Sequence, residues 1–353
     1  METTIQIKKV KDSQLSSFNS ENIQFGAVHS DHLLICHFEN GEWQKPRIQP
    51  FENLSLSPMA LCLHYGQTVF EGLKAYRLAD GNINIFRIQK NYERINKSLQ
   101  RMCMPELPED IFIGGIAALV ETDQAWVSSR SGESLYIRPL VIATEPRIGL
   151  RTSNEYMFIA ICKPMSNFFA GSIKVKVETE FVRAVQGGAG FAKNGGNYGA
   201  AFYPSSLARS QGFDQVLWTD GRENKYIEES GMMNIMFIID GIIVTPTLSG
   251  TILDGVTRDS ILTLARDSGM MIEERQISYQ ELEEHFKDGK AVEAFGAGTA
   301  AVITPIEEIT ISGKAYNPNV SSQARLFELK QNLQDIRYGL REDVYNWNHI
   351  IYL

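Results

Sequence analysis

Short β-strand patterns and amphipathic helical patterns alternate along most of this chain of 353 residues, and this alternation limits the possible folds more than any other feature. Runs rich in branched and aromatic residues, such as SLYIRPLVIAT (134–144) and IKVKVE (173–178), predict strands. Apolar residues recur at helical spacing in segments such as 91–102 and 257–269, and Gly269 predicts a helix end. Strands and helices in both halves predict an α/β (α+β) protein.

One segment interrupts the alternation and predicts a boundary between two domains. KPMSNFFAGS (163–172) contains proline, glycine and serine, and it lies between two predicted strands. A chain of this length is also long enough for two domains. We therefore expect an N-terminal domain at 1–163, an interdomain loop at 164–174 and a C-terminal domain at 175–353.

Composition and charge exclude several classes of partner. The net charge of −8 and the pI near 5.4 argue against nucleic-acid binding, which requires a basic face. No run of about 18 apolar residues predicts a transmembrane helix, and the N-terminus resembles neither a signal peptide nor a transit peptide. Four cysteines without a CxxC pair are typical of free thiols in a reducing cytosol, so we expect a cytoplasmic protein. The six histidines form no metal-binding motif, and we expect no metal.

Lys193 lies in the most distinctive segment of the chain. In VQGGAGFAKNGGNYGA (185–200), six glycines surround this lysine between Gly187 and Gly199. Glycine lets another group approach the backbone closely, and a lysine whose pKa is lowered can act as a nucleophilic amine. The alternative is a flexible glycine-rich surface loop with a solvated lysine. A phosphate-binding P-loop is excluded because GxxxxGK[ST] does not occur.

Three further motifs could hold a charged cofactor. Glu228 and Glu229 precede a glycine and an apolar strand, so one carboxylate could pair with a protonated pyridine nitrogen, or both could face water in a turn. The GVT of 255–257 enters a helix whose N-terminus could bind an anion, although an ordinary helix start capped by Thr257 is common. GAGTAA (296–301) matches a weak dinucleotide pattern but lacks its acidic partner, and an anion-binding turn explains it equally well.

Seven segments, taken in order, resemble the branched-chain amino acid aminotransferases, which are fold-type-IV pyridoxal-phosphate enzymes. The segments are LHYGQTVFEGLKAYR, NYERINKSLQR, SLYIRP, GFAKNGGNYGA, EESGMMN, GVTRDS and GAGTAAVITP. The similarity begins near Phe25 and extends to the C-terminus. It implies a D-amino-acid-aminotransferase-like fold, with a small N-terminal α/β domain and a larger, barrel-like C-terminal domain that carries the cofactor lysine.

The resemblance implies pyridoxal 5′-phosphate as the cofactor. Lys193 would hold it as a Schiff base and would act as the acid and base of the reaction. Tyr198 would donate a hydrogen bond to the 3-oxygen of the cofactor, and Glu229 would lie at its pyridine nitrogen, where a carboxylate keeps the ring protonated. The phosphate partners implied by the resemblance are Arg94, the backbone amides of Val256 and Thr257, and Thr299.

The resemblance also implies how substrates bind. The amides of Thr299 and Ala300 would hold the substrate carboxylate, and Arg138 and Tyr65 would receive the distal carboxylate of glutamate and 2-oxoglutarate. Family members are homodimers in which Tyr65 and Phe70 are candidates for serving the partner's site. The residues expected to line the side-chain pocket are Phe25, Tyr65, Phe70, Tyr136, Arg138 and Met232, with Phe168 closing over it.

The function expected from the resemblance is transfer of the amino group of leucine, isoleucine or valine to 2-oxoglutarate. A D-amino-acid transaminase or an aminodeoxychorismate lyase of the same fold is the first alternative, although LYIRP and the long N-terminal region favour the branched-chain group. A catalytically idle binding protein is the second alternative. The presence of Lys193, Tyr198, Glu229 and Arg94 together argues against it.

Overall fold

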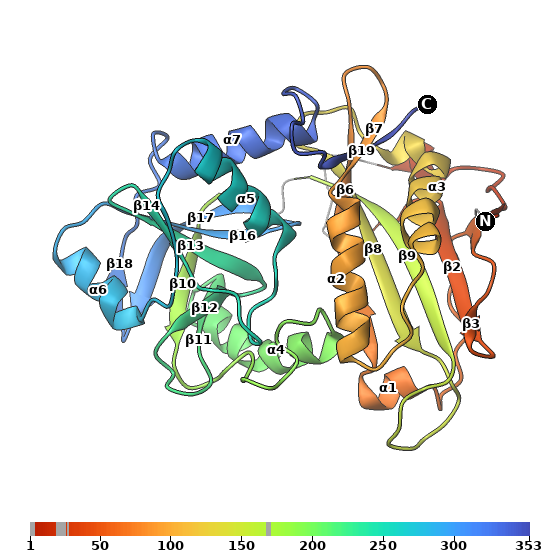
Figure 1. The fold of residues 1–353 in the computed structure, drawn as a ribbon, viewed down its shortest axis with the longest axis horizontal. Helices are drawn as coiled ribbons and strands as arrows, with labels where there is room; N and C mark the ends of the chain where they lie inside the picture. The colour runs from red at the N-terminus through yellow and green to blue at the C-terminus, as the bar shows by residue number, and fades with distance from the viewer. Residues whose placement is uncertain (1–3, 19–25, 27, 167–170) are drawn as a thin grey trace. The chain divides into compact units, whose positions relative to one another are not determined.

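The computed structural model describes residues 4–18, 26, 28–166 and 171–353, and it divides into two compact units (Figure 1). Unit 1 consists of three separate stretches of chain, and unit 2 of two. The stretches of unit 1 are 1–168, 192–196 and 336–353, and those of unit 2 are 169–191 and 197–335.

This division differs from the domain limits expected from the sequence at two places. The first change of unit falls within the expected loop 164–174, but 192–196 and 336–353 belong to unit 1. Both differences result from β-pairing, because Asn194 forms a β-bridge with Val69 and the C-terminal strand pairs with a strand of unit 1. Lys193 is therefore part of unit 1.

Unit 1 contains one sheet with the strand order β1-β4-β2-β9-β8-β6-β7-β19, with β3 beside β2 and β5 beside β8. Only the β1–β4 pair among these described strands is parallel. The strands are β1 (Gln6–Ile7), β2 (His32–Glu39), β3 (Glu42–Trp43), β4 (Arg47–Pro50), β5 (Thr68–Phe70), β6 (Leu73–Arg77), β7 (Ile83–Phe86), β8 (Ser134–Ala143), β9 (Tyr156–Met165) and β19 (Asn348–Ile351). The helices are α1 (Leu61–Tyr65), α2 (Ile88–Arg101) and α3 (Gly115–Thr122).

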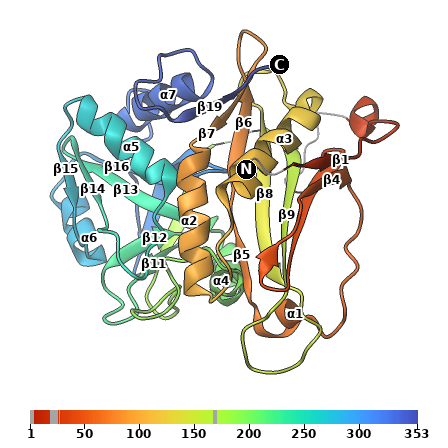
Figure 2. The same ribbon diagram turned by 45° about the vertical axis from the view of Figure 1, so that its right-hand side comes forward.

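Helices α2 and α3 cover one face of this sheet, as Figures 1 and 2 both show. Leu135 and Ile137 of β8 pack in the main apolar core with Ile95 of α2 and Leu119 of α3. Because side chains alternate along a strand, Tyr136 points to the opposite face. That opposite face is the one on which the substrate-binding residues predicted on β8 lie.

Unit 2 is built on a barrel of six strands. The strands follow the order β12-β11-β10-β17-β16-β13, and pairing of β12 with β13 closes the barrel. Strands β14 and β15 extend the sheet from β13, and β18 pairs with β17. The strands are β10 (Ile173–Glu178), β11 (Gln215–Thr219), β12 (Ile227–Ser230), β13 (Met233–Ile239), β14 (Ile242–Thr245), β15 (Ile272–Glu274), β16 (Val292–Gly298), β17 (Val302–Ile311) and β18 (Lys314–Tyr316). The helices are α4 (Gly195–Ser210), α5 (Val256–Asp267), α6 (Tyr279–Lys287) and α7 (Arg325–Arg337), of which α4 begins and α7 ends in unit 1.

The barrel confirms the expected fold of the C-terminal part, and apolar strand residues such as Val175, Ile235 and Phe237 fill its core. The helix predicted at 257–269 is also confirmed as α5, and Gly269 has the positive φ of +75° that suits a residue after a helix end. None of the described helices combines the length and apolar character needed to cross a membrane.

Candidate active site

Lys193 is held through its backbone by elements of unit 1. Its carbonyl accepts a hydrogen bond from the N–H of Phe70 (3.0 Å), and its own N–H donates to Oγ of Ser98 (3.0 Å). The following residue, Asn194, bridges to Val69 of β5. These contacts fix the lysine between a strand and α2, which does not fit a freely solvated loop lysine.

The Lys193 side chain lies near an aromatic ring and a buried carboxylate. Its Nζ is 5.0 Å from the ring centroid of Phe70. The neighbouring Glu71 is fully buried and accepts hydrogen bonds from Nε and Nη2 of Arg94 (both 2.7 Å) and from Asn91 (2.8 Å). Burial alone would raise the pKa of Glu71, but the charges of Arg94 and Lys193 and these hydrogen bonds lower it below its ordinary value. Lys193 therefore lies in the field of an ionised carboxylate.

Arg94, the predicted phosphate ligand, is buried on α2 in this bidentate pair with Glu71. Two parallel N–H···O bonds fix the plane of the guanidinium as well as its position. Ser98, one turn further along the same helix, contacts the backbone of Lys193. One helix thus positions both Arg94 and the lysine.

β8 brings Tyr136 and Arg138 together on the face of the sheet that α2 and α3 leave uncovered. Nη2 of Arg138 donates to the Tyr136 hydroxyl (2.9 Å), so the predicted common face of these two residues is confirmed. Cζ of Arg138 lies 4.8 Å from the ring centroid of Phe70, the ring that Lys193 also contacts. Nε of Arg138 is buried and has no hydrogen-bond partner among the described residues.

Lys163 joins this group, although the sequence analysis did not single it out. It lies directly opposite Tyr136 in the β8–β9 pair, and its Nζ is 5.0 Å from the centroid of the Tyr136 ring. Burial, together with the charge of Arg138, lowers the pKa of Lys163 to about 8. The face therefore carries two cations that repel each other.

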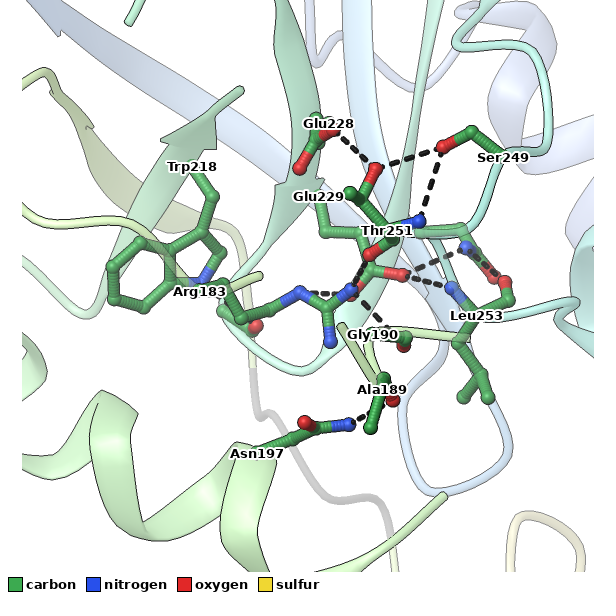
Figure 3. A network of polar contacts seen from close by, with 12 residues as sticks. Arg183, Ala189, Gly190, Asn197, Trp218, Glu228, Glu229, Ser249, Thr251 and Leu253 are labelled. Carbon is green, nitrogen blue, oxygen red and sulfur yellow. Dashed lines mark hydrogen bonds and ion pairs between the residues drawn. The ribbon is translucent and has the colours of Figure 1, made fainter. Parts of the chain in front are cut away.

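In unit 2, a polar network surrounds Glu229 (Figure 3). Oε2 of Glu229 forms an ion pair with Nε of Arg183 (3.0 Å), although the N–H direction does not meet hydrogen-bond geometry. Oε1 accepts hydrogen bonds from the backbone N–H of Leu253 (2.8 Å) and from Nδ2 of Asn234 (3.4 Å). These donors stabilise a negative charge on a buried side chain, which is the charge that a protonated pyridine would require.

Glu228 has different surroundings, although it adjoins Glu229. Its Oε1 accepts a hydrogen bond from the hydroxyl of Thr251, which also contacts Oγ of Ser249 (2.7 Å). Its Oε2 is buried without a hydrogen-bond partner among the described residues, and burial raises the pKa of Glu228. Both glutamates are buried, so the interpretation of an acidic turn facing water is wrong.

Arg183 links Glu229 to the glycine-rich segment that precedes Lys193. Its Nη2 donates to the carbonyls of Gly190 (3.3 Å) and Thr251, as Figure 3 shows. A Cβ at position 190 would lie 2.6 Å from both Cβ of Ala184 and the Thr251 carbonyl oxygen, so the close approach requires glycine.

The N-terminus of α5 has the form of an anion site. Its N-cap residue is Gly255, and Thr257 lies inside the helix, so the alternative of a cap formed by Thr257 is not observed. Val256 and Thr257 are buried, and a Cβ at Gly255 would collide with the side chain of Asn234. The backbone N–H groups and the helix dipole at such an end favour a phosphate.

Tyr198, Thr299 and Ala300 lie in unit 2. Tyr198 is in the first turns of α4, and it is partly buried. Thr299 and Ala300 form part of the turn that joins β16 and β17, and both are partly buried. Such a turn presents backbone N–H groups, as the predicted anion-binding role requires.

Tyr65 and Met232 are more exposed than Phe70, Tyr136 and Arg138, the other predicted pocket residues that the structure describes. Tyr65 ends α1 and is 42 % exposed, and Met232 lies in the turn before β13 and is 61 % exposed. Phe25 and Phe168, which were also predicted to line or close the pocket, lie outside the described residues.

Sequence reasoning missed several residues of these arrangements, of which four matter most for the charge of the site. A buried charge generally needs a partner, so a partner for Arg94 and for Glu229 could have been expected, although not identified. Lys163 gave a usable signal, because a lysine at the end of an apolar strand is unusual. These four residues are Glu71, Lys163, Arg183 and Thr251.

Solved structures of known proteins share this fold. The branched-chain amino acid aminotransferase from Escherichia coli matches with a TM-score of 0.72 and 25 % identity, covering 90 % of this chain and 98 % of that chain. The branched-chain amino acid aminotransferase from Thermobaculum terrenum, in its PLP-containing holo-form, matches with a TM-score of 0.72 and 23 % identity, covering 92 % and 99 %. At 23 % identity, the second match concerns the fold alone.

Comparison of sequences agrees with the chemistry of the site. The model of the family described as amino-transferase class IV matches residues 68–309. A branched-chain-amino-acid aminotransferase 2 of Bacillus subtilis (strain 168) is 43 % identical over 330 residues, which cover 92 % of this chain and 91 % of that protein. A probable branched-chain-amino-acid aminotransferase of Staphylococcus epidermidis is 41 % identical, and the alignment covers 96 % of this chain and 98 % of that protein. The chain belongs to the class IV amino-transferases and, within them, to the family of branched-chain-amino-acid aminotransferases.

Proposed function

We propose that this protein is a branched-chain-amino-acid transaminase. It transfers the amino group of L-leucine, L-isoleucine or L-valine reversibly to 2-oxoglutarate, which gives branched 2-oxo acids and L-glutamate. The observation that carries the proposal is the pair of cations at Phe70, where Nζ of Lys193 and Cζ of Arg138 lie 5.0 and 4.8 Å from the ring centroid. A reactive amine and a carboxylate-binding group beside one apolar ring suit an enzyme that accepts both apolar and acidic substrates.

Pyridoxal 5′-phosphate is the cofactor, and the residues present fit it. The N-terminus of α5 suits the phosphate, because Val256 and Thr257 place buried backbone amides in its first turn and the N-cap residue is a glycine. The family resemblance assigns Arg94 and Thr299 as further donors to the phosphate. Glu229 would face the pyridine nitrogen, and its charge is stabilised by Arg183 and Leu253. The bound cofactor supplies an electron sink for the bond that breaks at the substrate Cα.

The protein's own groups bind the cofactor and move protons. Lys193 would hold the cofactor through Nζ, and the same amine would carry the proton to and from the substrate Cα. Tyr198 would donate its hydroxyl hydrogen to the 3-oxygen of the cofactor. The amides of Thr299 and Ala300 would hold the substrate carboxylate, and Arg138 with Tyr65 would receive a distal carboxylate. Phe70, Tyr136 and Met232 would provide apolar walls, and the family resemblance assigns a further wall to Phe25 and the closing role to Phe168, both of which lie outside the described residues.

We further propose a cytoplasmic homodimer. Tyr65 is 42 % exposed in the single chain, which fits a role at the neighbouring subunit's site.

One absorbance experiment tests the function. Adding L-leucine to the cofactor-loaded protein should shift the visible absorption band, and adding 2-oxoglutarate should reverse the shift. No change with any amino acid would indicate an idle binding protein. A response to D-amino acids only would indicate a D-amino-acid transaminase, and activity confined to an aminated cyclic substrate would indicate the lyase.

A further inference from the structure

We propose that Lys163 is a specificity-determining residue that binds the distal carboxylate of the acidic substrate together with Arg138. The proposal rests on the transaminase function and adds a second cation to its dicarboxylate subsite. It would explain how one site accepts both an apolar side chain and a carboxylate.

The strand register places Lys163 on the predicted substrate face. Residues directly opposite each other in an antiparallel pair share a face, and Lys163 is the partner of Tyr136. Arg138, two residues along β8, contacts Tyr136 through its hydroxyl and its ring, at 2.9 Å and 5.4 Å. The ammonium and the guanidinium therefore approach the same tyrosine from two neighbouring strands.

Successive side-chain contacts connect Arg138 and Lys163 to the reactive Lys193. Phe70 contacts both Lys193 and Arg138, and Tyr136 contacts both Arg138 and Lys163. All five residues belong to unit 1, so the sequence of contacts lies within one compact body. A substrate whose Cα lies at Lys193 and whose side chain passes Phe70 would direct its distal end towards Arg138 and Lys163.

The electrostatics of this face favour an incoming anion. The positive charges of Arg138 and Lys163 repel each other. The pKa of Lys163 is lowered by its burial and by the charge of Arg138. Nε of Arg138 is buried without a hydrogen-bond partner among the described residues, which leaves a donor for an acceptor from outside. A carboxylate would relieve the repulsion and satisfy that donor, whereas a neutral side chain would do neither.

A lysine suits dual recognition better than a second arginine. With a pKa of about 8, Lys163 can lose its proton at moderate cost when a leucine side chain occupies the pocket. Its flexible chain can also move the amine away from apolar atoms. When a carboxylate is bound, the charged form is favoured again.

The test compares two oxo acids in the same half-reaction. The pyridoxamine form of the enzyme is mixed with 2-oxoglutarate or with 4-methyl-2-oxopentanoate, which differ in the distal group, and KM and kcat are measured by cofactor absorbance. Lys163→Met should raise KM for 2-oxoglutarate about 10-fold or more, as expected for a lost charged hydrogen bond. Its KM for 4-methyl-2-oxopentanoate and its kcat for both should change less than about 2-fold. Lys163→Arg should restore the low KM.

A pH series on the wild type requires no variant. Between pH 7 and 9, the KM for 2-oxoglutarate divided by the KM for 4-methyl-2-oxopentanoate should rise as Lys163 loses its proton. In Lys163→Arg this ratio should stay constant. Near Lys163 on this face lie Arg138 and Tyr136 of β8, Lys74 of β6, and the apolar Leu33 and Ile35 of β2. Strand alternation and register place further titratable or charged groups along the same face, namely His37 and Glu39 of β2, Arg47 of β4 and Tyr76 of β6. Burial lowers the pKa of His37 below its ordinary 6.5 and raises the pKa of Tyr76 above its ordinary 10, so neither group titrates between pH 7 and 9. Groups that bind the cofactor or the substrate's first carboxylate act on both oxo acids, so their titration cancels in the ratio.

The outcomes are distinguishable. If Lys163→Met raised KM or lowered kcat equally for both oxo acids, Lys163 would only support the sheet through Tyr136. That result would overturn the proposal. A KM ratio that is unchanged in Lys163→Met and independent of pH in the wild type would also overturn it. A wild type that accepts neither oxo acid would refute the transaminase function itself, and the proposal with it.

Discussion

The network around Glu229 in unit 2 and the face around Tyr136 in unit 1 differ in how their charged side chains are compensated. Glu229 is compensated inside the protein by Arg183 and by the N–H of Leu253. Around Tyr136, by contrast, Arg138 and Lys163 are two cations close enough for one to lower the pKa of the other. The first arrangement maintains one charge state, whereas the second is suited to respond to a charge that a substrate brings.

Lys193 belongs to neither arrangement, so its removal should leave both intact and still cause the largest loss. Lys193→Ala should lower turnover by about 10⁴-fold, because acid–base catalysis of this kind typically contributes up to that factor. The variant should still bind cofactor, but not covalently. Borohydride reduction of the wild type, followed by peptide mapping, should place the pyridoxyl group on Lys193. A label on another lysine would contradict the assignment.

Unit 1 also contains a charge that is compensated inside the protein, in the ion pair of Arg94 and Glu71. Variants that break this pair test what it contributes. Breaking a fully buried ion pair costs roughly 3–5 kcal/mol, so Arg94→Ala and Glu71→Gln should lower the free energy of unfolding by similar amounts. Only Arg94→Ala should also weaken cofactor retention, because its proposed second partner is the phosphate. Urea unfolding and cofactor release measure the two effects. Equal cofactor affinity in both variants would leave Arg94 with a structural role alone.

The same pair predicts how acid acts on the fold. The pKa of Glu71 is lower in the folded protein than its ordinary value of 4.5, so its stabilising contribution is present above pH 4.5. That contribution is lost as the pH falls through the folded pKa. Urea unfolding of Glu71→Gln should show a smaller decrease in stability over this range than unfolding of the wild type.

Glu229→Gln removes the charge that the network in Figure 3 stabilises. We expect turnover to fall about 100-fold, the usual order for loss of one preorganised electrostatic group. Glu228→Gln is the matched control and should change turnover less than about 2-fold, because Glu228 hydrogen-bonds to Thr251 and not to the Arg183 and Leu253 groups that stabilise the charge of Glu229. The reverse result would mean that Glu228 faces the pyridine nitrogen.

Arg138→Met tests whether the face around Tyr136 binds a substrate carboxylate. The substitution removes the charge and keeps much of the side-chain volume. It should raise KM for 2-oxoglutarate about 10-fold or more, while the half-reaction with L-leucine changes little. The two half-reactions are measured separately by cofactor absorbance. If the rates of both half-reactions fall by the same factor, Arg138 supports the fold and does not bind the substrate.

The smallest effect is expected at Glu228 and concerns stability. Its folded pKa is raised by burial, so the stability it contributes is present below its ordinary pKa of 4.5 and is lost as the pH rises towards the folded value. Glu228→Gln cannot ionise, so its stability relative to that of the wild type should be greater at pH 8 than at pH 5. Urea unfolding at these two pH values measures the difference. A constant difference would show that ionisation of Glu228 does not affect the fold.

Local patterns in the sequence predicted the elements that depend on neighbouring residues. The alternation of SLYIRPLVIAT predicted β8 and the common face of Tyr136 and Arg138, and helical spacing predicted α2 and α5. Contacts between distant segments could not be predicted in this way. The pairing of β12 with β13 and the position of 192–196 in unit 1 depend on such contacts.

Within the candidate site, sequence reasoning identified side chains by motif but not their partners. Arg183 and Glu71 are ordinary charged residues in the sequence, and only the fold brings each to its buried opposite charge. Lys163 became noticeable because strand pairing places it opposite Tyr136. A pattern along one strand cannot reveal which residue lies across from it.

The three separate stretches of unit 1 have a consequence for truncation and protein engineering. A fragment that ends after β9 would lack both 192–196 and β19. It would lose the partner of β7, whose unpaired edge is a template for aggregation. Expression of the N-terminal half alone should therefore give an insoluble product, whereas co-expression with the remainder of the chain could restore a folded complex.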